Sequence, residues 1–343
     1  GQGKTRFSLP LPVVLGEKGR AELMNVETGM WKDRKANHCY TLPWQLEVGD
    51  TGALEVYGRL PLEIYLQGVL PAEMPSSWPL EALKAQAVAA RSEILADYGG
   101  KYAMEGFDFT IQEDCRAYGG LGGHTSATDR AVKETAGQVL VRDGKIATTV
   151  FCACCGGWTE NNEIIWAGPP NPVLRAKPDF PDAAKEMPNL QKSGWERWVT
   201  TRPKAWCSGH RDFRWKRRYT VQELSTLVNK QYAVGTIKTI RLGDRGPGGR
   251  LRNVTIEGTK GKVTVDRDVA IRRVFGGLPS TMFIINSESD KSERVVYNIV
   301  GAGYGHGVGL CQQGAKAMAE QGLHYQNILK QYFDEVAIER FAS

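Results

Sequence analysis

A single carboxyl group in the segment GVLPAEMPSSWPLEALKAQAVAARSEIL, residues 68–95, is placed where it could do acid–base chemistry. Glu73 lies in a proline-bounded turn beside Met74, just before a strong helical pattern. A helix N-terminus favours an ionised carboxylate, whereas an apolar wall favours the protonated form that a general acid needs. The residues alone leave open a second interpretation, in which Glu73 is a solvated or helix-capping glutamate.

The helix expected at 79–98 carries a second candidate, Arg91. Pro79 suits the first position of a helix, and Gly99-Gly100 ends it. At about 100° per residue, Arg91 falls inside the apolar stripe, which consists of Leu80, Leu83, Ala87, Ile94, Leu95 and Tyr98. A guanidinium there must reach water or pair with an acid. Arg91 is therefore either a structural residue or one that orients a catalytic loop.

The segment GAGYGHGVGLCQQGAKAMAEQG, residues 301–322, combines closely spaced glycines with polar side chains. Such glycines let the backbone approach a ligand or another part of the chain. A helix from about His306 would place Cys311 and Gln312 on its inner face, where Gln312 needs a hydrogen-bond partner. His306 is either structural or functional. Its spacing from Cys311 is a weak match to a thiol nucleophile and base, because most such enzymes bring the base from elsewhere in the fold.

The chain has seven cysteines, an odd number that excludes complete pairing within the chain. Cys152, Cys154 and Cys155 lie close together in FCACCGG, and Cys115 lies upstream. These four thiols could hold a structural Zn²⁺ ion, with His124 as a further possible ligand. C-x-C-C is not the usual C-x₂-C zinc spacing, so a disulfide from Cys115 to one of the three, or free buried thiols, is the competing interpretation.

The composition and charge of the chain limit the classes of function that it could have. The 343 residues carry a formal charge of +6, much of it from HRDFRWKRRY at 210–219. A basic surface could bind anionic wall polymers or lipid headgroups, but no nucleic-acid motif accompanies it. No run of 18 or more apolar residues predicts a membrane span. The first residues lack a convincing signal peptide, so we expect the chain to begin after a removed leader or anchor.

The remaining pattern predicts an α+β fold, because strands and helices mix without regular βαβ alternation. Residues 1–70 are expected to be mostly strands, and 137–157 a hairpin that turns at Asp143-Gly144. The other expected helices are 126–135, one from Val221 with Thr220 as its N-cap, a short one near 266–276, 306–321 and 324–333. The other expected strands are 236–242, 251–257, 261–265, 281–286 and 294–300. A Trp-rich insertion at about 160–215 is expected to be irregular and could line a groove. Its tryptophans, from Trp158 to Trp215, could either pack in the core or stack on sugar rings.

Two stretches resemble the signature motifs of a known family. YLQGVLPAEMPSSWPLEALKAQAVAARSEIL and GAGYGHGVGLCQQGAKAMAEQG are similar to those of the stage II sporulation protein D (SpoIID) family, to which amidase enhancers are related. CRAYGG, GGRLRNVTIEG and LPSTMFII follow in the family's order. The match runs from about residue 55 to the end, with residues 1–50 and 160–210 poorly covered, and it implies a catalytic domain at 56–343 with strands and helices around a central groove. The strand-rich region at 1–55 is predicted from its residue pattern alone. Cys311 departs from the family motif, which usually has Ser there.

The resemblance also implies an activity, that of an extracytoplasmic lytic transglycosylase acting on peptidoglycan glycan strands, with no required cofactor. Glu73, the acid of the family's EMP motif, would be the single catalytic acid and base. Arg91, Tyr304, His306 and Gln312 would bind the sugar or orient Glu73. The alternative is a non-catalytic wall-binding protein that enhances an N-acetylmuramoyl-L-alanine amidase, so the implied partners are glycan strands and an amidase, not nucleic acid.

Overall fold

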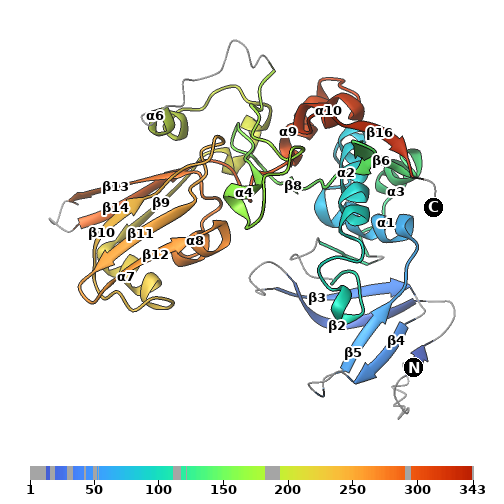
Figure 1. Ribbon diagram of the computed structural model, residues 1–343, viewed down its shortest axis with the longest axis horizontal. Coiled ribbons are helices and arrows are strands. Elements are labelled where there is room, and N and C mark those ends of the chain that lie inside the picture. The colour runs from blue at the N-terminus through green and yellow to red at the C-terminus, as the bar shows by residue number, and fades with distance from the viewer. Residues whose placement is uncertain are drawn as a thin grey trace. The chain divides into compact units, whose positions relative to one another are not determined.

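The computed structural model describes residues 13–15, 20–28, 34–41, 44–48, 52, 54–110, 117–120, 122–181, 194–289 and 295–341. The chain forms two compact units, and Figure 1 colours the chain by residue number. Unit 1 comprises residues 1–83 and 97–136, and unit 2 comprises residues 84–96 and 137–343. The strands form small, mostly antiparallel sheets, and helices occur between the strands along the chain. This arrangement confirms the α+β class.

Unit 1 begins with strands. β1 (Val13–Leu15), β4 (Trp44–Val48) and β5 (Leu54–Gly58) form one antiparallel sheet in the order β1-β4-β5. β2 (Arg20–Thr28) and β3 (Arg34–Thr41) pair as a separate antiparallel hairpin. The pattern predicted strands around β1, β4 and β5, but RAELMNVET and RKANHCYT mix charged and small polar residues, which hides a strand signal.

Helix α1 (Leu62–Glu73) corrects the expectation that strands continue to residue 70. Its buried side chains include Leu66, Val69 and Leu70, which recur at helical rather than alternating spacing. Pro71 lies in the last turn, and the helix closes with the Met74 N–H donating to Leu70 O at 3.0 Å. Helix α3 (Ser126–Glu134) confirms the helix predicted at 126–135; it is capped by Thr125 and packs against α1.

Helix α2 (Leu80–Asp97) agrees with the predicted 79–98 helix, with Pro79 at its N-cap. It is buried on every side between Ala82 and Ile94 rather than along one stripe. Alanines occupy many of these positions and let neighbouring elements approach closely from several directions. Tyr98, expected on the buried stripe, instead caps the helix and is 67% exposed.

Two three-stranded sheets share the main core of unit 2. One has the order β10 (Ile237–Leu242), β11 (Asn253–Gly258), β12 (Lys262–Asp266), and the other β13 (Phe283–Ser289), β14 (Val295–Gly301), β9 (Trp215–Thr220). Helices α7 (Val221–Asn229) and α8 (Asp268–Val274) complete this core. The five strands and two helices predicted for this region are confirmed, including the Thr220 cap, which accepts from the Glu223 N–H, whereas β9 was not predicted.

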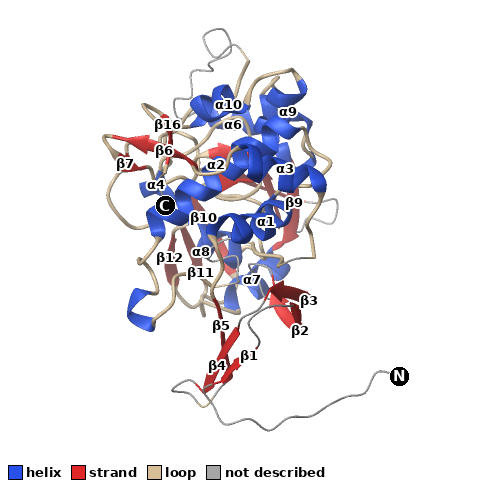
Figure 2. Ribbon diagram, turned by 90° about the vertical axis from the view of Figure 1, so that its right-hand side faces the viewer, coloured by secondary structure: helices blue, strands red, loops and turns tan. Residues whose placement is uncertain are grey.

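A smaller sheet has the order β16-β6-β7, formed by β6 (Gln138–Arg142), β7 (Lys145–Ile146) and β16 (Ala337–Arg340) (Figure 2). The predicted hairpin turn is confirmed, because Asp143 and Gly144 both have positive φ, 52° and 72°. The second arm is shorter than expected. After Ile146 the chain leaves the sheet, and β8 (Phe151–Cys152) pairs in parallel with β15 (Leu310–Cys311).

The described part of the 160–215 insertion consists of short helical turns joined by irregular chain, as predicted: α4 (Asn162–Ile165), α6 (Gly194–Thr200), η2 (Trp206–Gly209) and η3 (Arg211–Phe213). Helices α9 (Gln312–Glu320) and α10 (Tyr325–Tyr332) follow near the end of the chain, and η1 (Ala103–Glu105) belongs to unit 1. Among the described residues, no helix combines the length and apolarity needed to cross a bilayer.

Candidate functional site

Glu73 is the last residue of α1, seven residues before Leu80, where α2 begins. Its position therefore differs from the predicted one, since it ends one helix instead of lying in the turn that starts the next. Its Oε1 accepts a hydrogen bond of 2.8 Å from the backbone N–H of Ala117. The side chain is partly buried, and the neighbouring Met74 is fully buried.

A close approach of the backbone positions this donor. A Cβ on Gly68 would lie 2.4 Å from the Tyr118 ring, so the ring can pack on α1 only because residue 68 is glycine. The Gly119 N–H donates to Gly68 O at 3.1 Å and fixes the register of segment 117–120 along the helix. Ala117 is thereby held one helical turn further along, opposite the carboxyl group of Glu73.

The carboxyl end of a helix carries partial negative charge, which disfavours an ionised carboxylate, whereas the Ala117 N–H stabilises one. The two influences oppose each other at one side chain. The Ala117 N–H thus fixes the carboxyl group of Glu73 at the end of α1.

The glycine-rich segment lies in unit 2 and is a loop over residues 302–309, not the start of a helix. Gly303, Gly305, Gly307 and Gly309 all have positive φ, between 70° and 93°. That alternation breaks the helical pattern predicted from His306, so β15 comes next and α9 begins only at Gln312. Gln312 is buried near the helix N-terminus, as expected of a polar residue that faces inward.

His306 is fixed by two hydrogen bonds. Its Nε2 lies 2.8 Å from Phe151 O, and its Nδ1 accepts from the Val308 N–H at 3.1 Å. These bonds require the neutral tautomer with the proton on Nε2. Burial lowers the pKa of His306 to about 4, and both ring nitrogens are engaged. His306 therefore joins the loop to β8 and is not poised to activate Cys311 as a base.

One exposed aromatic side chain lies beside His306, and a second is close to it in sequence. The Trp166 ring lies 4.8 Å from the His306 ring between centroids, and Tyr304 precedes His306 by two residues. Trp166 is 38% and Tyr304 44% exposed. Trp158, Trp195, Trp198 and Trp215, by contrast, are buried in the core. Among the described tryptophans of the insertion, Trp166 is thus the most exposed and the most accessible to a ligand.

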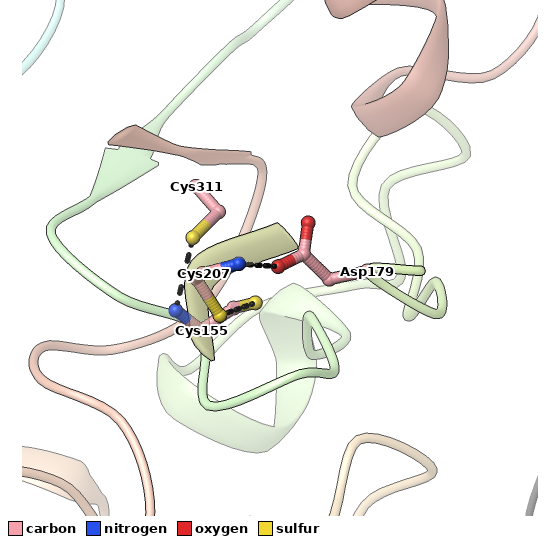
Figure 3. A group of neighbouring side chains, drawn as sticks. All are labelled: Cys155, Asp179, Cys207 and Cys311. Atoms are coloured by element: carbon pink, nitrogen blue, oxygen red, sulfur yellow. Dashed lines mark hydrogen bonds between the residues drawn. The ribbon is translucent and has the colours of Figure 1, made fainter. Parts of the chain in front are cut away.

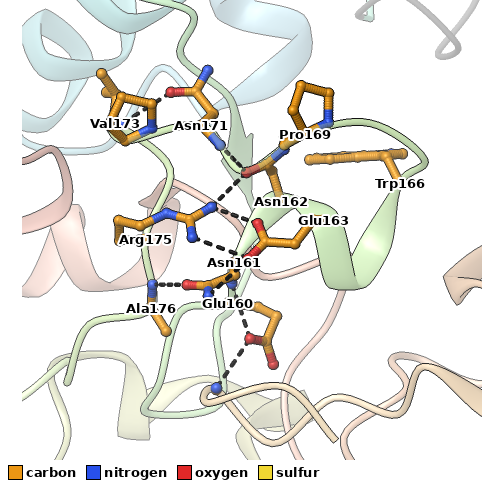
Figure 4. A network of polar contacts seen from close by, with 12 residues as sticks. Glu160, Asn161, Asn162, Glu163, Trp166, Pro169, Asn171, Val173, Arg175 and Ala176 are labelled. Carbon is orange, nitrogen blue, oxygen red and sulfur yellow. Dashed lines mark hydrogen bonds and ion pairs between the residues drawn. The ribbon is translucent and has the colours of Figure 1, made fainter.

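A network of polar contacts shapes the chain that presents Trp166 (Figure 4). Arg175 pairs with Glu163 and also donates to Asn162 Oδ1 at 2.6 Å. Asn162 Oδ1 accepts in addition from the Asn171 N–H, and its Nδ2 donates to Pro169 O at 3.0 Å. These bonds close residues 162–175 into a compact loop without a sheet or long helix, so the segment is ordered although its sequence has no periodicity.

Glu160 and Arg250 form a buried polar group that the sequence analysis missed. Glu160 accepts backbone N–H bonds from Asn161, Gly248 and Arg250 at 2.9 to 3.0 Å, and Arg250 donates to Cys155 O and Trp158 O. Both side chains are fully buried. Burial raises the pKa of Glu160, while Arg250 and the three N–H donors oppose that shift. The TENNEIIW and GPGGR motifs could have signalled this contact, since closely spaced glycines permit a close approach.

Arg91 is buried in α2, where its Nη1 donates to Gln138 O at 3.0 Å and to Ala87 O at 3.5 Å. It thereby links α2 to β6. Arg91, Tyr304, His306 and Gln312 all belong to unit 2, whereas Glu73 belongs to unit 1. Their predicted roles toward a sugar stay predictions.

The cysteines group differently from the predicted metal set. Cys115 lies outside the described residues. Cys155 is brought together with Cys207, Cys311 and Asp179, and one ligand atom from each lies within 4.8 Å of all the others. Cys152 and Cys154 are buried beside this group and interact with Cys311. All six described cysteines, Cys39 included, are free thiols. His124, considered as a further ligand, lies instead 3.8 Å from Asp129 in unit 1.

Comparisons with known proteins identify the family. The profile described as Stage II sporulation protein matches residues 50–141, which include Glu73 and Arg91. The chain is 30% identical over 284 residues to an uncharacterised protein of Brachyspira hyodysenteriae, covering 82% of this chain and 68% of that protein. The chain belongs to the SpoIID family.

Other proteins similar to this chain have names that state a function. An amidase enhancer of Bacillus subtilis is 31% identical over 291 residues, and the alignment covers 78% of this chain but only 39% of the enhancer. Stage II sporulation protein D of Bacillus amyloliquefaciens is 28% identical over 294 residues, covering 82% of this chain and 74% of that protein. A profile for a domain of unknown function matches residues 160–309, which span the insertion, both main sheets and the whole loop at 302–309.

Proposed function

We propose that this SpoIID-family protein is an extracytoplasmic lytic transglycosylase that cleaves the bond between N-acetylmuramic acid and N-acetylglucosamine in peptidoglycan. The observation that carries the proposal is the placement of Glu73. This partly buried carboxyl group lies in the family-matched region and accepts from the backbone N–H of Ala117 at the end of a helix. A group in that setting can both give and take a proton.

The proposed reaction uses this one carboxyl group twice. Protonated Glu73 gives its proton to the glycosidic oxygen as the bond to muramic C1 breaks. The resulting carboxylate takes the proton from the muramic C6 hydroxyl, whose oxygen bonds to C1. The products are a 1,6-anhydro end and a free N-acetylglucosamine hydroxyl, and Glu73 is protonated again. Hydrolytic glycosidases need a second carboxylate as nucleophile or base; here the substrate supplies the nucleophile.

The exposed rings of Trp166 and Tyr304 support a glycan as the ligand. Aromatic faces stack on the apolar faces of sugar rings, and a rigid surrounding loop lowers the entropy lost on binding. The polar network of residues 162–175 and the two bonds of His306 provide that rigidity. We assign these two aromatics to glycan binding.

The direct test is incubation of the purified protein with glycan strands freed of stem peptides, followed by mass spectrometry of the products. Glu73→Gln should give no 1,6-anhydro ends. Glu105→Gln, which removes an exposed carboxylate of the same unit, is the matched control and should give them at the wild-type rate. Undiminished product from Glu73→Gln would remove Glu73 from the mechanism.

The similarity to an amidase enhancer favours one second candidate, a non-catalytic wall-binding protein that accelerates an amidase. It differs from the first in a simple way. A folded wild-type protein would release no anhydro ends from bare glycan, yet would raise the rate of a cell-wall amidase on intact peptidoglycan. Glu73→Gln would then leave the acceleration unchanged.

A further inference from the structure

Four polar side chains from separate parts of unit 2 meet in its interior (Figure 3). Cys155 follows β8, Asp179 comes from the insertion, Cys207 lies in η2, and Cys311 ends β15. All four are buried, at 1% exposure or less. Buried thiols and a buried carboxyl group in mutual contact are costly unless something satisfies them together.

The spacing of these side chains suits a single tetrahedral ion. A zinc–sulfur distance of about 2.3 Å in a tetrahedral site places two sulfurs about 3.7 Å apart. The Sγ atoms of Cys155 and Cys207 are 3.6 Å apart, and every pair of donor atoms in the group lies within 4.8 Å. An iron–sulfur cluster would need its cysteine sulfurs spread around a larger core.

Hydrogen bonds around the four side chains orient them toward a common centre. The Cys155 N–H donates to Cys311 Sγ at 3.2 Å, and the Gly157 N–H donates to Cys155 Sγ at 3.4 Å. Asp179 accepts from the Cys207 N–H at 3.1 Å and from the Tyr332 hydroxyl at 2.7 Å. Such outer bonds are typical of metal ligands, because they fix orientation and offset the charge of thiolates.

Two further residues fit this arrangement. A Cβ on Gly314 would lie 2.0 Å from the Tyr332 hydroxyl and 2.7 Å from Asp179 Oδ1, so only glycine leaves room for that pair. Arg214 is a cation beside the group, since its guanidinium donates to Gly156 O at 3.0 Å, next to Cys155. Three thiolates and a carboxylate around Zn²⁺ leave a net negative charge, part of which a nearby guanidinium offsets.

We propose that Cys155, Asp179, Cys207 and Cys311 form a structural zinc site. Four protein ligands close the coordination sphere, which is the pattern of structural rather than catalytic zinc. The ion joins the 160–215 insertion to β8 and to the end of the glycine-rich loop. It thus supplies folding free energy to a stretch with little regular secondary structure. The site is independent of Glu73 and of the activity proposed above.

The test measures metal in protein purified without chelators and exposed to Zn²⁺. We expect about one zinc per chain by elemental analysis. The Cys207→Ser variant should bind much less zinc than the wild type. The midpoint of its thermal unfolding should also be lower. Cys39→Ser is the matched control, because it removes a described thiol of unit 1 and should keep the zinc. Glu73→Gln should also keep it, which separates this proposal from the catalytic one.

A second measurement covers the case in which Cys207→Ser does not fold. Wild-type protein loaded with Co²⁺ in place of Zn²⁺ should show thiolate-to-cobalt charge-transfer absorption and the visible bands of tetrahedral cobalt. Absence of bound zinc and of these bands would overturn the proposal. So would a denatured wild-type chain with a Cys155–Cys207 disulfide in peptide mapping, because a disulfide removes both thiolates as ligands.

Discussion

The setting of Glu73 in unit 1 differs from that of two hydrogen-bonded polar groups of unit 2, His306 and Glu160. The Glu73 carboxyl group accepts from the backbone N–H of Ala117 at a helix end whose dipole disfavours a negative charge. In unit 2, His306 uses both ring nitrogens and Glu160 accepts three backbone N–H bonds. A carboxyl group that must change its charge needs a balanced setting, whereas fully bonded groups hold a fold together. This contrast distinguishes Glu73, which we expect to react with the substrate, from His306 and Glu160, which we expect to stabilise the fold.

The largest expected effect concerns Glu73 itself. Glu73→Gln keeps the size of the side chain but removes its proton chemistry, so cleavage of bare glycan should fall about a thousand-fold or more. The thermal unfolding midpoint should stay close to that of the wild type, because Gln can still accept from the Ala117 N–H. Reaction rates and calorimetry on the same preparation check both parts. A large loss of stability would mean that Glu73 is a structural residue like Glu160.

Glu160 should show the opposite behaviour. Glu160→Ala leaves three buried N–H groups without an acceptor and removes the counter-charge of Arg250, so it should lower the free energy of unfolding by about 3 to 5 kcal/mol. Glu196→Ala, which removes an exposed carboxylate of the same unit, should change it by less than about 0.5 kcal/mol. Denaturant titration measures both variants. Equal stability of the two would contradict the assignment of Glu160 as a support.

His306 predicts a pH dependence of stability. Its pKa is about 4 in the folded protein, below the ordinary value of 6.5. The unfolded chain therefore binds the proton more readily, and the stabilisation present above pH 6.5 is lost as the pH falls toward 4. The loss from this group is at most about 3 kcal/mol. His306→Asn should flatten that part of the stability profile, and an unchanged slope between pH 6.5 and 4 would contradict the buried neutral ring.

Trp166 should affect binding more than chemistry. Trp166→Ala removes the exposed ring beside His306 and should weaken the binding of bare glycan about three- to tenfold, the range expected for one aromatic contact. Trp206→Ala, elsewhere in the insertion, is the comparison variant. Binding to glycan strands by calorimetry distinguishes them. If both variants bound equally well, the aromatic surface at Trp166 would lose its proposed role.

The smallest expected effect is electrostatic. Lys216, Arg217 and Arg218 are exposed on β9. Contact with anionic wall polymers should weaken when added salt shortens the screening distance to below about 10 Å. Co-sedimentation with cell walls at low and high ionic strength measures this. Arg217→Gln should reduce the salt dependence, and salt-independent binding would exclude the patch.

Local rules predicted most of unit 2 from the sequence. The Thr220 cap, the Asp143-Gly144 turn and five of the six strands of the two main sheets follow from side-chain chemistry at known spacing, whereas β9 lies in the basic 210–219 stretch and was missed. Helix α1 was missed, because its apolar residues were read as strand continuation and Pro71 suggested a break. The loop at 302–309 was read as helix because positive φ at alternate glycines is a property of the backbone, which a side-chain pattern does not reveal.

The residues of the candidate sites likewise divide into those that the sequence predicted and those that only the structure revealed. Glu73 was identified because a family motif marks it. The partners of Cys155 were not, because Asp179, Cys207 and Cys311 are distant in sequence and only the folded chain brings them together. Glu160 and Arg250 were missed for the same reason, since their contact spans 90 residues.

The measurement that tests the central claim most directly is cleavage of bare glycan strands in water enriched in oxygen-18. If Glu73 moves one proton out and back while the muramic C6 hydroxyl attacks C1, the new ends are 1,6-anhydro sugars without heavy oxygen. New reducing ends that carry the label would show that water is the nucleophile, which would contradict the single-carboxylate mechanism.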